Sequence, residues 1–243
     1  DDRLMRTCAA QIISGTKLLM RAVGVDRAIV GIEENKPEAI EAIRFAATVS
    51  PGIEVVELKK RYPQGGEKQL IEALTGREVP MGGLPVDVGC VVDNVATAYA
   101  VFDAVCRRRP LTQRVVTVTG PSLTNPGNFL VPFGTPISRL IEAAGGLPDD
   151  TGKVIAGGPM MGRAVSNLDA PTTKGLGGIL VLPESMSRRP AVQPCIRCAK
   201  CVEACPMGLE PYLLASLSRL GRYEDAARRT IMGCIECGCC SYS

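Results

Sequence analysis

The chain has 243 residues, of which 46% are hydrophobic and 22% charged, a balance that suits a globular protein of two domains or of one domain with a small appendage. A net charge of +3, without a basic stripe interleaved with aromatic residues, argues against a nucleic-acid partner. No apolar run approaches the ~20 residues that cross a bilayer and no signal-peptide pattern opens the sequence, so we expect any membrane association to be peripheral, through a partner. The absence of histidine excludes Ser-His-Asp and Cys-His nucleophiles, His-ligated zinc or haem, and Rieske centres.

The first hundred residues alternate between helical and strand patterns. The expected helices cover Thr7–Ala22, Pro37–Val49, Gln69–Leu74 and Val95–Arg107. The expected strands are Arg27–Ile32 and Ile53–Leu58. Strands separated by helices are typical of parallel sheets, so residues 1–109 are predicted to form an α/β domain with a Rossmann-like parallel layer.

The pattern changes at Pro110. Short strands are predicted at Arg114–Thr119, Gly127–Pro132, Lys153–Ala156 and Gly178–Leu182, with one helix at Ile137–Ala144. The first two strands are expected to form a hairpin, and residues 110–183 a small mixed sheet that holds the helix, folded as a unit of its own. Residues 184–194 lack apolar periodicity and are predicted to be a linker. Two short helices are expected beyond it, about Tyr212–Leu220 and Tyr223–Met232, with a core stripe of Leu213, Leu214, Leu217 and Leu220.

Eight of the eleven cysteines lie between Cys195 and Cys240, which suggests a metal site in a reducing compartment rather than a disulfide framework. The first four follow the spacing C-x2-C-x2-C-x3-C-P, which is the bacterial ferredoxin run: Cys195, Cys198, Cys201 and Cys205, followed by Pro206. The spacing of two residues recurs at Cys234, Cys237 and Cys240, whereas Cys239 falls between ligand positions and is expected to be a bystander. Two iron–sulfur clusters are the favoured interpretation, and zinc bound by Cys-x-x-Cys pairs remains the alternative.

In two-cluster ferredoxins the first three cysteines of a run hold one cluster and the fourth ligates the other. Cys205 is therefore expected to join Cys234, Cys237 and Cys240, while Cys195, Cys198 and Cys201 hold the other cluster. The spacing places a further ligand at position 244. Together with the start at Asp1, this predicts that residues 195–243 are a truncated ferredoxin-like domain and that the sequence is part of a longer chain.

The glycine-rich segments are weak signals by themselves. Tyr62 to Lys68 opens a helix and could place backbone N–H groups against a phosphate, yet it lacks the dinucleotide fingerprint and the P-loop pattern. For the isolated loop, plain turn chemistry is the favoured explanation, and Asp93-Asn94 is ambiguous because Asn is a common helix cap. Gly157–Gly162 and the glycines from Gly175 to Gly178 are predicted to be tight turns of the small sheet.

Taken together, these motifs resemble a known family. Three of them occur in the order seen in the FMN- and NADH-binding flavoprotein subunit of respiratory complex I: Asp2-Arg3-Leu4-Met5, Gly65-Gly66-Glu67-Lys68 and Asp93-Asn94-Val95-Ala96-Thr97. The later segments more closely resemble one branch of that family, the C subunits of Rnf electron-transport complexes: Val116 to Gly120, Asn125 to Asn128, Gly157 to Gly162, Pro194 to Cys198 and Cys205 to Leu209.

The resemblance implies a cofactor site in the first domain. It implies that FMN is contacted by Gly66, Glu67, Lys68, Asp93, Asn94 and Thr97. The middle region would be a soluble-ligand-binding β-grasp-like (SLBB) domain. The family's main FMN loop is expected upstream of Asp1, so the sequence as it stands is not expected to retain FMN or NADH or to react with NADH, and no catalytic residue is assigned in it.

The resemblance also implies a function. We expect an electron-transfer subunit of an ion-translocating oxidoreductase that passes electrons between NADH, FMN and partner subunits through two 4Fe–4S clusters. The implied partners are other subunits of a membrane complex and ferredoxin-type carriers, and the implied location is peripheral, on the cytoplasmic face of the bacterial inner membrane. Two alternatives stay open: a flavin and iron–sulfur protein similar to cobalamin reductase, and a non-catalytic, zinc-stabilised docking module.

Overall fold

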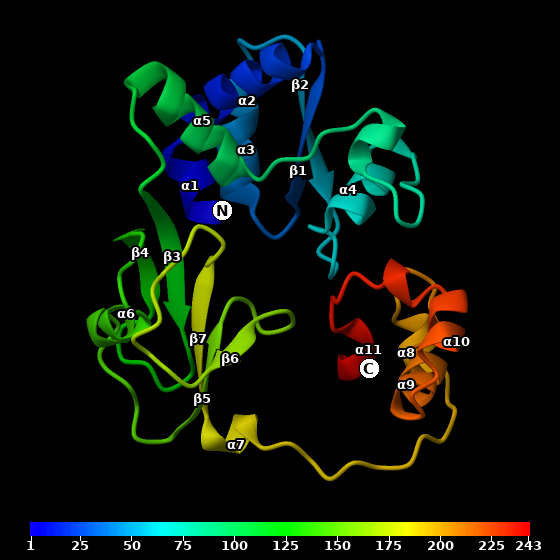
Figure 1. The fold of residues 1–243 in the computed structure, drawn as a ribbon. Helices are drawn as coiled ribbons and strands as arrows, with labels where there is room; N and C mark the ends of the chain where they lie inside the picture. Colours follow the sequence, from blue (N-terminus) through cyan, green and yellow to red (C-terminus); the bar gives the residue numbers. More distant parts are fainter. The chain divides into compact units, whose positions relative to one another are not determined.

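A computed structural model describes all residues from Asp1 to Ser243 (Figure 1). The chain divides into two compact units, Asp1–Leu111 and Thr112–Ser243. None of its helices combines the length and the apolar character that crossing a membrane requires.

The first unit is a parallel pair of strands between helices. In chain order its elements are α1 (Asp2–Thr7), α2 (Ala9–Val23), β1 (Ala28–Glu33), α3 (Pro37–Ala47), β2 (Ile53–Leu58), α4 (Glu67–Thr75), the 3-10 turn η1 (Pro85–Val88) and α5 (Val95–Arg107). The strands β1 and β2 pair in parallel with Ala28 opposite Ile53. This agrees with the parallel α/β arrangement that the alternation predicts, in a sheet of two strands.

Alternate residues of β1 face different helices, because side chains of a strand point to opposite faces in turn. Ile32 packs into a core with residues of α1, α2, α3 and α5. Gly31, on the other face, lies under α4: a Cβ there would come within 3.1 Å of the Leu70 side chain and 3.2 Å of the Leu74 side chain. The absence of a side chain at Gly31 therefore lets α4 approach the sheet.

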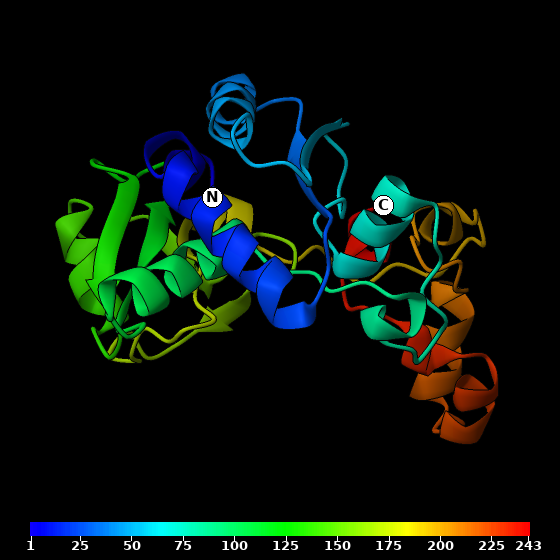
Figure 2. The ribbon, with the colours of Figure 1, turned by 90° about the horizontal axis from the view of Figure 1, so that it is seen from above.

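Helices α2 and α5 pack side by side, as Figure 2 shows from above. A Cβ on Gly15 would lie only 1.8 Å from the carbonyl oxygen of Ala98, so the contact requires glycine at this position. This close approach sets the position of the N-terminal turn of α5.

The second unit opens with a five-stranded mixed sheet. Its elements are β3 (Gln113–Thr119), β4 (Gly127–Pro132), α6 (Ile137–Ala143), β5 (Thr151–Ala156), β6 (Arg163–Val165), β7 (Gly178–Pro183) and the single turn α7 (Glu184–Ser187). The strand order is β4-β3-β7-β5-β6, in which only β3 and β7 pair in parallel. The predicted hairpin of the first two strands is confirmed, with Arg114 opposite Val131.

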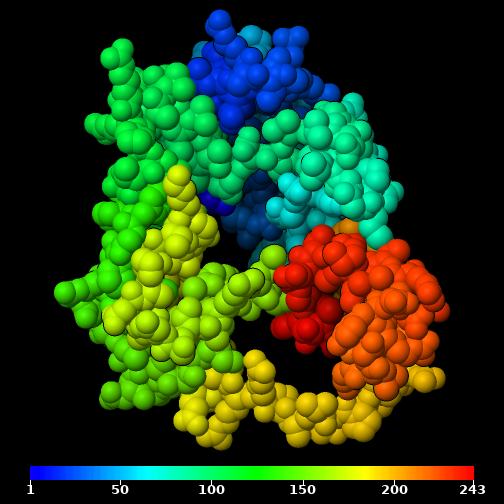
Figure 3. Space-filling model, viewed as in Figure 1, coloured from blue at the N-terminus to red at the C-terminus, as the bar shows by residue number.

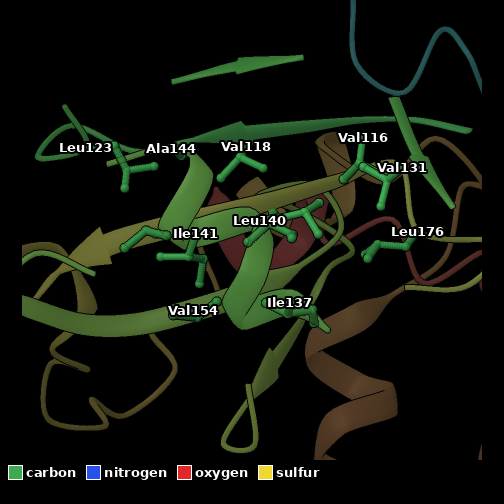
Figure 4. Packing of buried hydrophobic residues seen from close by; sticks show 12 residues of the cluster. Val116, Val118, Leu123, Val131, Ile137, Leu140, Ile141, Ala144, Val154 and Leu176 are labelled. Carbon is green, nitrogen blue, oxygen red and sulfur yellow. The ribbon is translucent and has the colours of Figure 1, made fainter. Parts of the chain in front are cut away.

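The core of this sheet lies under α6 (Figure 4). Ile137, Leu140 and Ile141 of the helix pack against Val116 and Val118 of β3, and all five side chains are buried. The apolar residues of β3 alternate with exposed ones, which is why the period of two in the sequence locates the strand correctly.

The remaining residues form a set of short helices. They are α8 (Lys200–Glu203), α9 (Pro211–Arg219), α10 (Tyr223–Arg228), the 3-10 turn η2 (Ile231–Gly233) and α11 (Cys239–Tyr242). Helix α9 packs on α8 and α10, and α11 packs on α8. Residues 188–200, which lead into these helices, are exposed nearly throughout and form the golden strip along the lower edge of Figure 3.

Five details differ from the sequence-based expectations. The expected helix Thr7–Ala22 begins at Ala9 instead, because Cys8 leaves the helical region with φ −129°, and a separate helix, α1, precedes it. The expected helix Tyr223–Met232 ends at Arg228, because Thr230 adopts φ 58°. Leu220 follows the end of α9 and is 72% exposed rather than part of the core. The segment predicted as a linker begins with a helical turn, α7, and the short strand β6 has no clear sequence signal.

Candidate iron–sulfur and flavin sites

The two cysteine runs adopt the same unusual backbone. In each run the residue before the second cysteine has a positive φ, 56° at Arg197 and 55° at Glu236. The residue after the second cysteine does too, with 64° at Ala199 and 81° at Gly238. Each of these latter two residues then caps a one-turn helix, α8 or α11, that carries the next cysteine.

Positive φ is costly for residues with a Cβ, by about 1–2 kcal/mol each, so three of these four positions are strained. Left-handed residues within such loops turn successive backbone N–H groups toward one point, an arrangement that surrounds anionic groups and iron–sulfur clusters. The repeated backbone therefore fits a thiolate-bound cluster in each run, and a zinc pair would not by itself account for the third cysteine of each run.

Backbone N–H groups donate to two of the cysteine sulfurs. The amide of Leu209 donates to Sγ of Cys205 at 3.4 Å, just after the turn at Pro206. The amide of Glu236 donates to Sγ of Cys234, also at 3.4 Å. Hydrogen bonds from backbone amides to the cysteine sulfurs are one of the features by which proteins tune iron–sulfur clusters.

The structure brings Cys205 next to the later run. Burial raises the pKa of the Cys240 thiol, and the nearby thiols of Cys205 and Cys234 raise it further. Burial also raises the pKa of Cys239, which interacts with Cys237, Cys240 and Cys205. The raised pKa values of Cys239 and Cys240 describe these thiols without a bound cation, whereas a metal centre would favour the thiolate form of its ligands.

The early run is more open than the later one. The first cysteine of each run is exposed and the third half-buried, so the difference lies at the second: Cys198 is exposed, whereas Cys237 is only 8% exposed. All eleven cysteines are free thiols. No three thiol or carboxylate side chains converge closely enough to form a closed metal site. The chemistry and backbone of the donor set fit clusters, and closure of the ligand shell is not seen.

A small apolar core supports both runs. Leu209, Leu214, Leu217 and Ala226 are buried together, and Cys205, Met207, Leu213 and Ile231 pack against them. Glu210 and Arg229 form an ion pair at 3.1 Å between the start of α9 and the end of α10. Helices α9 and α10 thereby hold the end of the early run near the beginning of the later one.

The first three residues with an expected role in FMN binding lie at the N-terminus of α4. Gly66 caps the helix in an extended conformation, and Glu67 and Lys68 form its first turn. The ammonium of Lys68 donates to the carbonyl oxygen of Pro80 at 3.1 Å. Gly65 has open space where a Cβ would stand, which allows a ligand to approach the backbone closely. Glu67 is exposed and, as a carboxylate, suits N–H or hydroxyl groups of a ligand better than a phosphate.

The other three residues lie at the N-terminus of α5. Asn94 caps this helix, accepting a hydrogen bond from the amide of Ala96 at 2.9 Å, and its side-chain amide donates to Asp1 at 3.0 Å. Asp93 and Thr97 are exposed beside it. The cap explains Asn94 structurally, and the bond to Asp1 brings together the segments of two motifs that carry the family resemblance. The six residues thus occupy the N-termini of two different helices.

Two protein families match parts of the chain. The Nuo51 FMN-binding domain matches residues 1–103, and the SLBB domain matches residues 115–164. A chain of an NAD+-reducing NiFe-hydrogenase has a similar fold, with a TM-score of 0.62 and 25% identity over 74% of this chain and 37% of that chain.

Longer matches come from subunits of oxidoreductase complexes. The C subunit of the proton-translocating ferredoxin:NAD+ oxidoreductase complex of Clostridium ljungdahlii is 46% identical, over 93% of this chain and 49% of that protein. The C subunit of the Na+-translocating ferredoxin:NAD+ oxidoreductase complex of Acetobacterium woodii is 42% identical, over 96% of this chain and 52% of that protein. The chain is homologous to the C subunits of Rnf-type complexes. It spans about half the length of these two relatives. The expected resemblance to this family is confirmed.

Proposed function

We propose that the chain carries electrons within a membrane-associated ferredoxin:NAD+ oxidoreductase complex of the Rnf type. The observation that carries the proposal is the doubled cysteine run with one shared backbone, at Cys195–Cys201 and at Cys234–Cys240. Relatives named as C subunits of ferredoxin:NAD+ oxidoreductase complexes support it. Two 4Fe–4S clusters, when bound, would accept and release single electrons.

The cysteines are proposed to serve the two clusters in a crossed manner. Cys195, Cys198 and Cys201 would hold one cluster, and Cys205 would join Cys234, Cys237 and Cys240 around the other. The interaction between the thiols of Cys205 and Cys240 supports this arrangement. The hydrogen bond from the amide of Leu209 to Cys205 also supports it, because it ties that sulfur to the segment that leads into α9.

The chain's own residues would set the properties of these sites. Amide N–H groups such as that of Glu236 would stabilise charge on the sulfurs, and the core under α9 would fix the separation of the two runs. Backbone donors and exclusion of water are the two main means by which a protein sets a cluster's potential.

The first unit is proposed to contribute part of a flavin site. The N-termini of α4 and α5 would offer Gly66, Glu67, Lys68, Asp93, Asn94 and Thr97, with Glu67 accepting hydrogen bonds from the ligand. The match to the Nuo51 FMN-binding domain supports this role. FMN, when bound, converts two-electron hydride chemistry to one-electron transfer. The location on the cytoplasmic face of a membrane complex, through partner subunits, is part of the same proposal.

A visible absorption spectrum of anaerobically purified protein, together with metal analysis, tests the cluster proposal. We expect broad absorbance that bleaches with dithionite, and iron and sulfide in proportion. Colourless protein with stoichiometric zinc would overturn it in favour of a zinc-stabilised docking module. A protein that binds clusters yet reduces cobalamin rather than exchanging electrons with ferredoxin and NADH would favour the cobalamin-reductase alternative instead.

A further inference from the structure

The turn between β5 and β6 is short and tightly constrained. Gly157 has φ 113°, and the amide of Gly162 donates to the carbonyl oxygen of Gly158 at 2.8 Å. A Cβ on Gly162 would come within 2.4 Å of both that oxygen and the Ile155 side chain. The two ends of the turn therefore pass too close together for side chains, and the turn presents Pro159, Met160 and Met161 at its tip.

The tip of this turn lies against the later cysteine run. A Cβ on Gly238 would lie 3.1 Å from the carbonyl oxygen of Met160 and 3.7 Å from the terminal methyl of its side chain. Gly238 stands directly between Cys237 and Cys239, and its φ of 81° also favours glycine. Two independent constraints thus act on this residue, the backbone conformation and the approach of Met160.

The two neighbouring methionines differ in exposure. Met160 is half-buried against the run, whereas the side chain of Met161 is 59% exposed. On the other side of the contact, Cys237 is buried, whereas its counterpart in the early run, Cys198, is exposed. An apolar side chain therefore packs against the later run. Residues 188–200, which include Cys195 and Cys198 of the early run, are exposed and have no such side chain packed on them.

We propose that Met160 is a positioning residue that shields the cluster of the later run from water. This inference rests on the proposed function, since it requires a cluster held by Cys205, Cys234, Cys237 and Cys240. Reduction adds negative charge to a cluster that four thiolates already make anionic, so exclusion of water disfavours the reduced form and lowers the potential. Met160 would thereby make the later cluster the harder one to reduce and the slower one to react with oxygen.

The test compares Met160→Ala with the matched control Met161→Ala in the cluster-containing protein. We measure the potential of each cluster by redox titration with electron paramagnetic resonance, and the rate at which visible absorbance bleaches in air. Met160→Ala is expected to raise the potential of the later cluster and to speed its bleaching several-fold, with the early cluster unchanged. Met161→Ala is expected to change neither the potentials nor the bleaching rate. Met160→Leu is expected to behave nearly as the wild type, because leucine keeps the apolar volume.

Hydrogen exchange gives a readout that does not depend on electron transfer. The amides of Ser241 and Tyr242 bond to the carbonyl oxygen of Gly238, so loosening at Met160 should speed their exchange in Met160→Ala alone. Equal behaviour of the two alanine variants, or equal shifts of both clusters, would overturn the inference while leaving the clusters established. If the anaerobically purified wild-type protein contained no iron, the proposed function on which the inference rests would itself be wrong.

Discussion

The early and the later cysteine runs share a ligand spacing and a backbone but differ in their surroundings. The early run has Ala199 at the left-handed position where the later run has Gly238, and Cys198 is exposed where Cys237 is buried. The same spacing gives the two loops the same backbone, whereas tertiary packing leaves Cys198 more exposed to water than Cys237. Since potential depends on exposure and on hydrogen bonds to sulfur, two matching motifs are expected to behave as unequal centres.

The largest effects are expected from substitution of the cysteine ligands themselves. Cys205→Ala should abolish the cluster of the later run, although Cys205 belongs to the early run in sequence, because its thiol lies with Cys240 and Cys234. Cys201→Ala should abolish the early cluster and leave the other. Iron counts and electron paramagnetic resonance on both variants measure the outcome.

The same two variants can also disprove the crossed arrangement. Loss of the same signal in both, with the other signal spared in both, would mean that the four early cysteines share one cluster. The crossed arrangement would then be wrong, and the proximity of Cys205 to Cys240 would be a matter of packing alone.

Removal of the metal should erase the difference between the runs by unfolding both. Only Leu209, Leu214, Leu217 and Ala226 are buried in this core, and three residues with positive φ in the runs carry side chains. So small a core leaves folding dependent on the bound centre, as in other small metal-binding domains. After chelation of iron, we expect rapid hydrogen exchange over residues 195–243.

The five-stranded sheet provides the control in the same experiment. Val116 and Val118 are fully buried under α6, so protection of the β3 amides should persist without metal. Protected amides in α9 after complete loss of iron would contradict the prediction and would show that the helix pair folds by itself.

Much of this arrangement could be predicted from the sequence, for definite physical reasons. The alternation of Val116 and Val118 with polar residues locates β3, and the spacing of the cysteines by itself indicates the metal chemistry. The end of α9 before Leu220 and the strain at Glu236 could not be predicted, because periodicity reports burial and not backbone conformation. The contact of Met160 with Gly238 joins residues far apart in the chain, and only the fold reveals it.

A smaller and symmetrical effect is expected from the shared core. Leu214 is 7% exposed, so Leu214→Ala should cost about 2–5 kcal/mol of unfolding free energy. Leu220→Ala is the matched control, since that side chain is 72% exposed and its loss should change stability by less than about 0.5 kcal/mol. Denaturant titration followed by visible absorbance measures both variants. Because the core supports both runs, the two clusters should be lost together, and separate losses would show that each run is stabilised independently.

The smallest expected effect concerns Cys239, a position at which the two runs differ in sequence. The corresponding residue of the early run is Lys200, two residues after the second cysteine in each case, so a thiol at this position is not required by the shared backbone. Burial raises the pKa of Cys239, and its side chain is hydrogen-bonded to that of Cys237, so it is expected to remain a protonated thiol that donates to a ligand sulfur. Cys239→Ala should therefore leave the iron content unchanged and lower the potential of the later cluster slightly, because loss of a donor to sulfur disfavours the reduced form. Redox titration of Cys239→Ala measures this shift, and Lys200→Ala is the control, since its loss removes no donor to a sulfur and should leave both potentials unchanged. Loss of iron in Cys239→Ala would contradict the prediction and would make Cys239 a ligand in place of one of the cysteines assigned above.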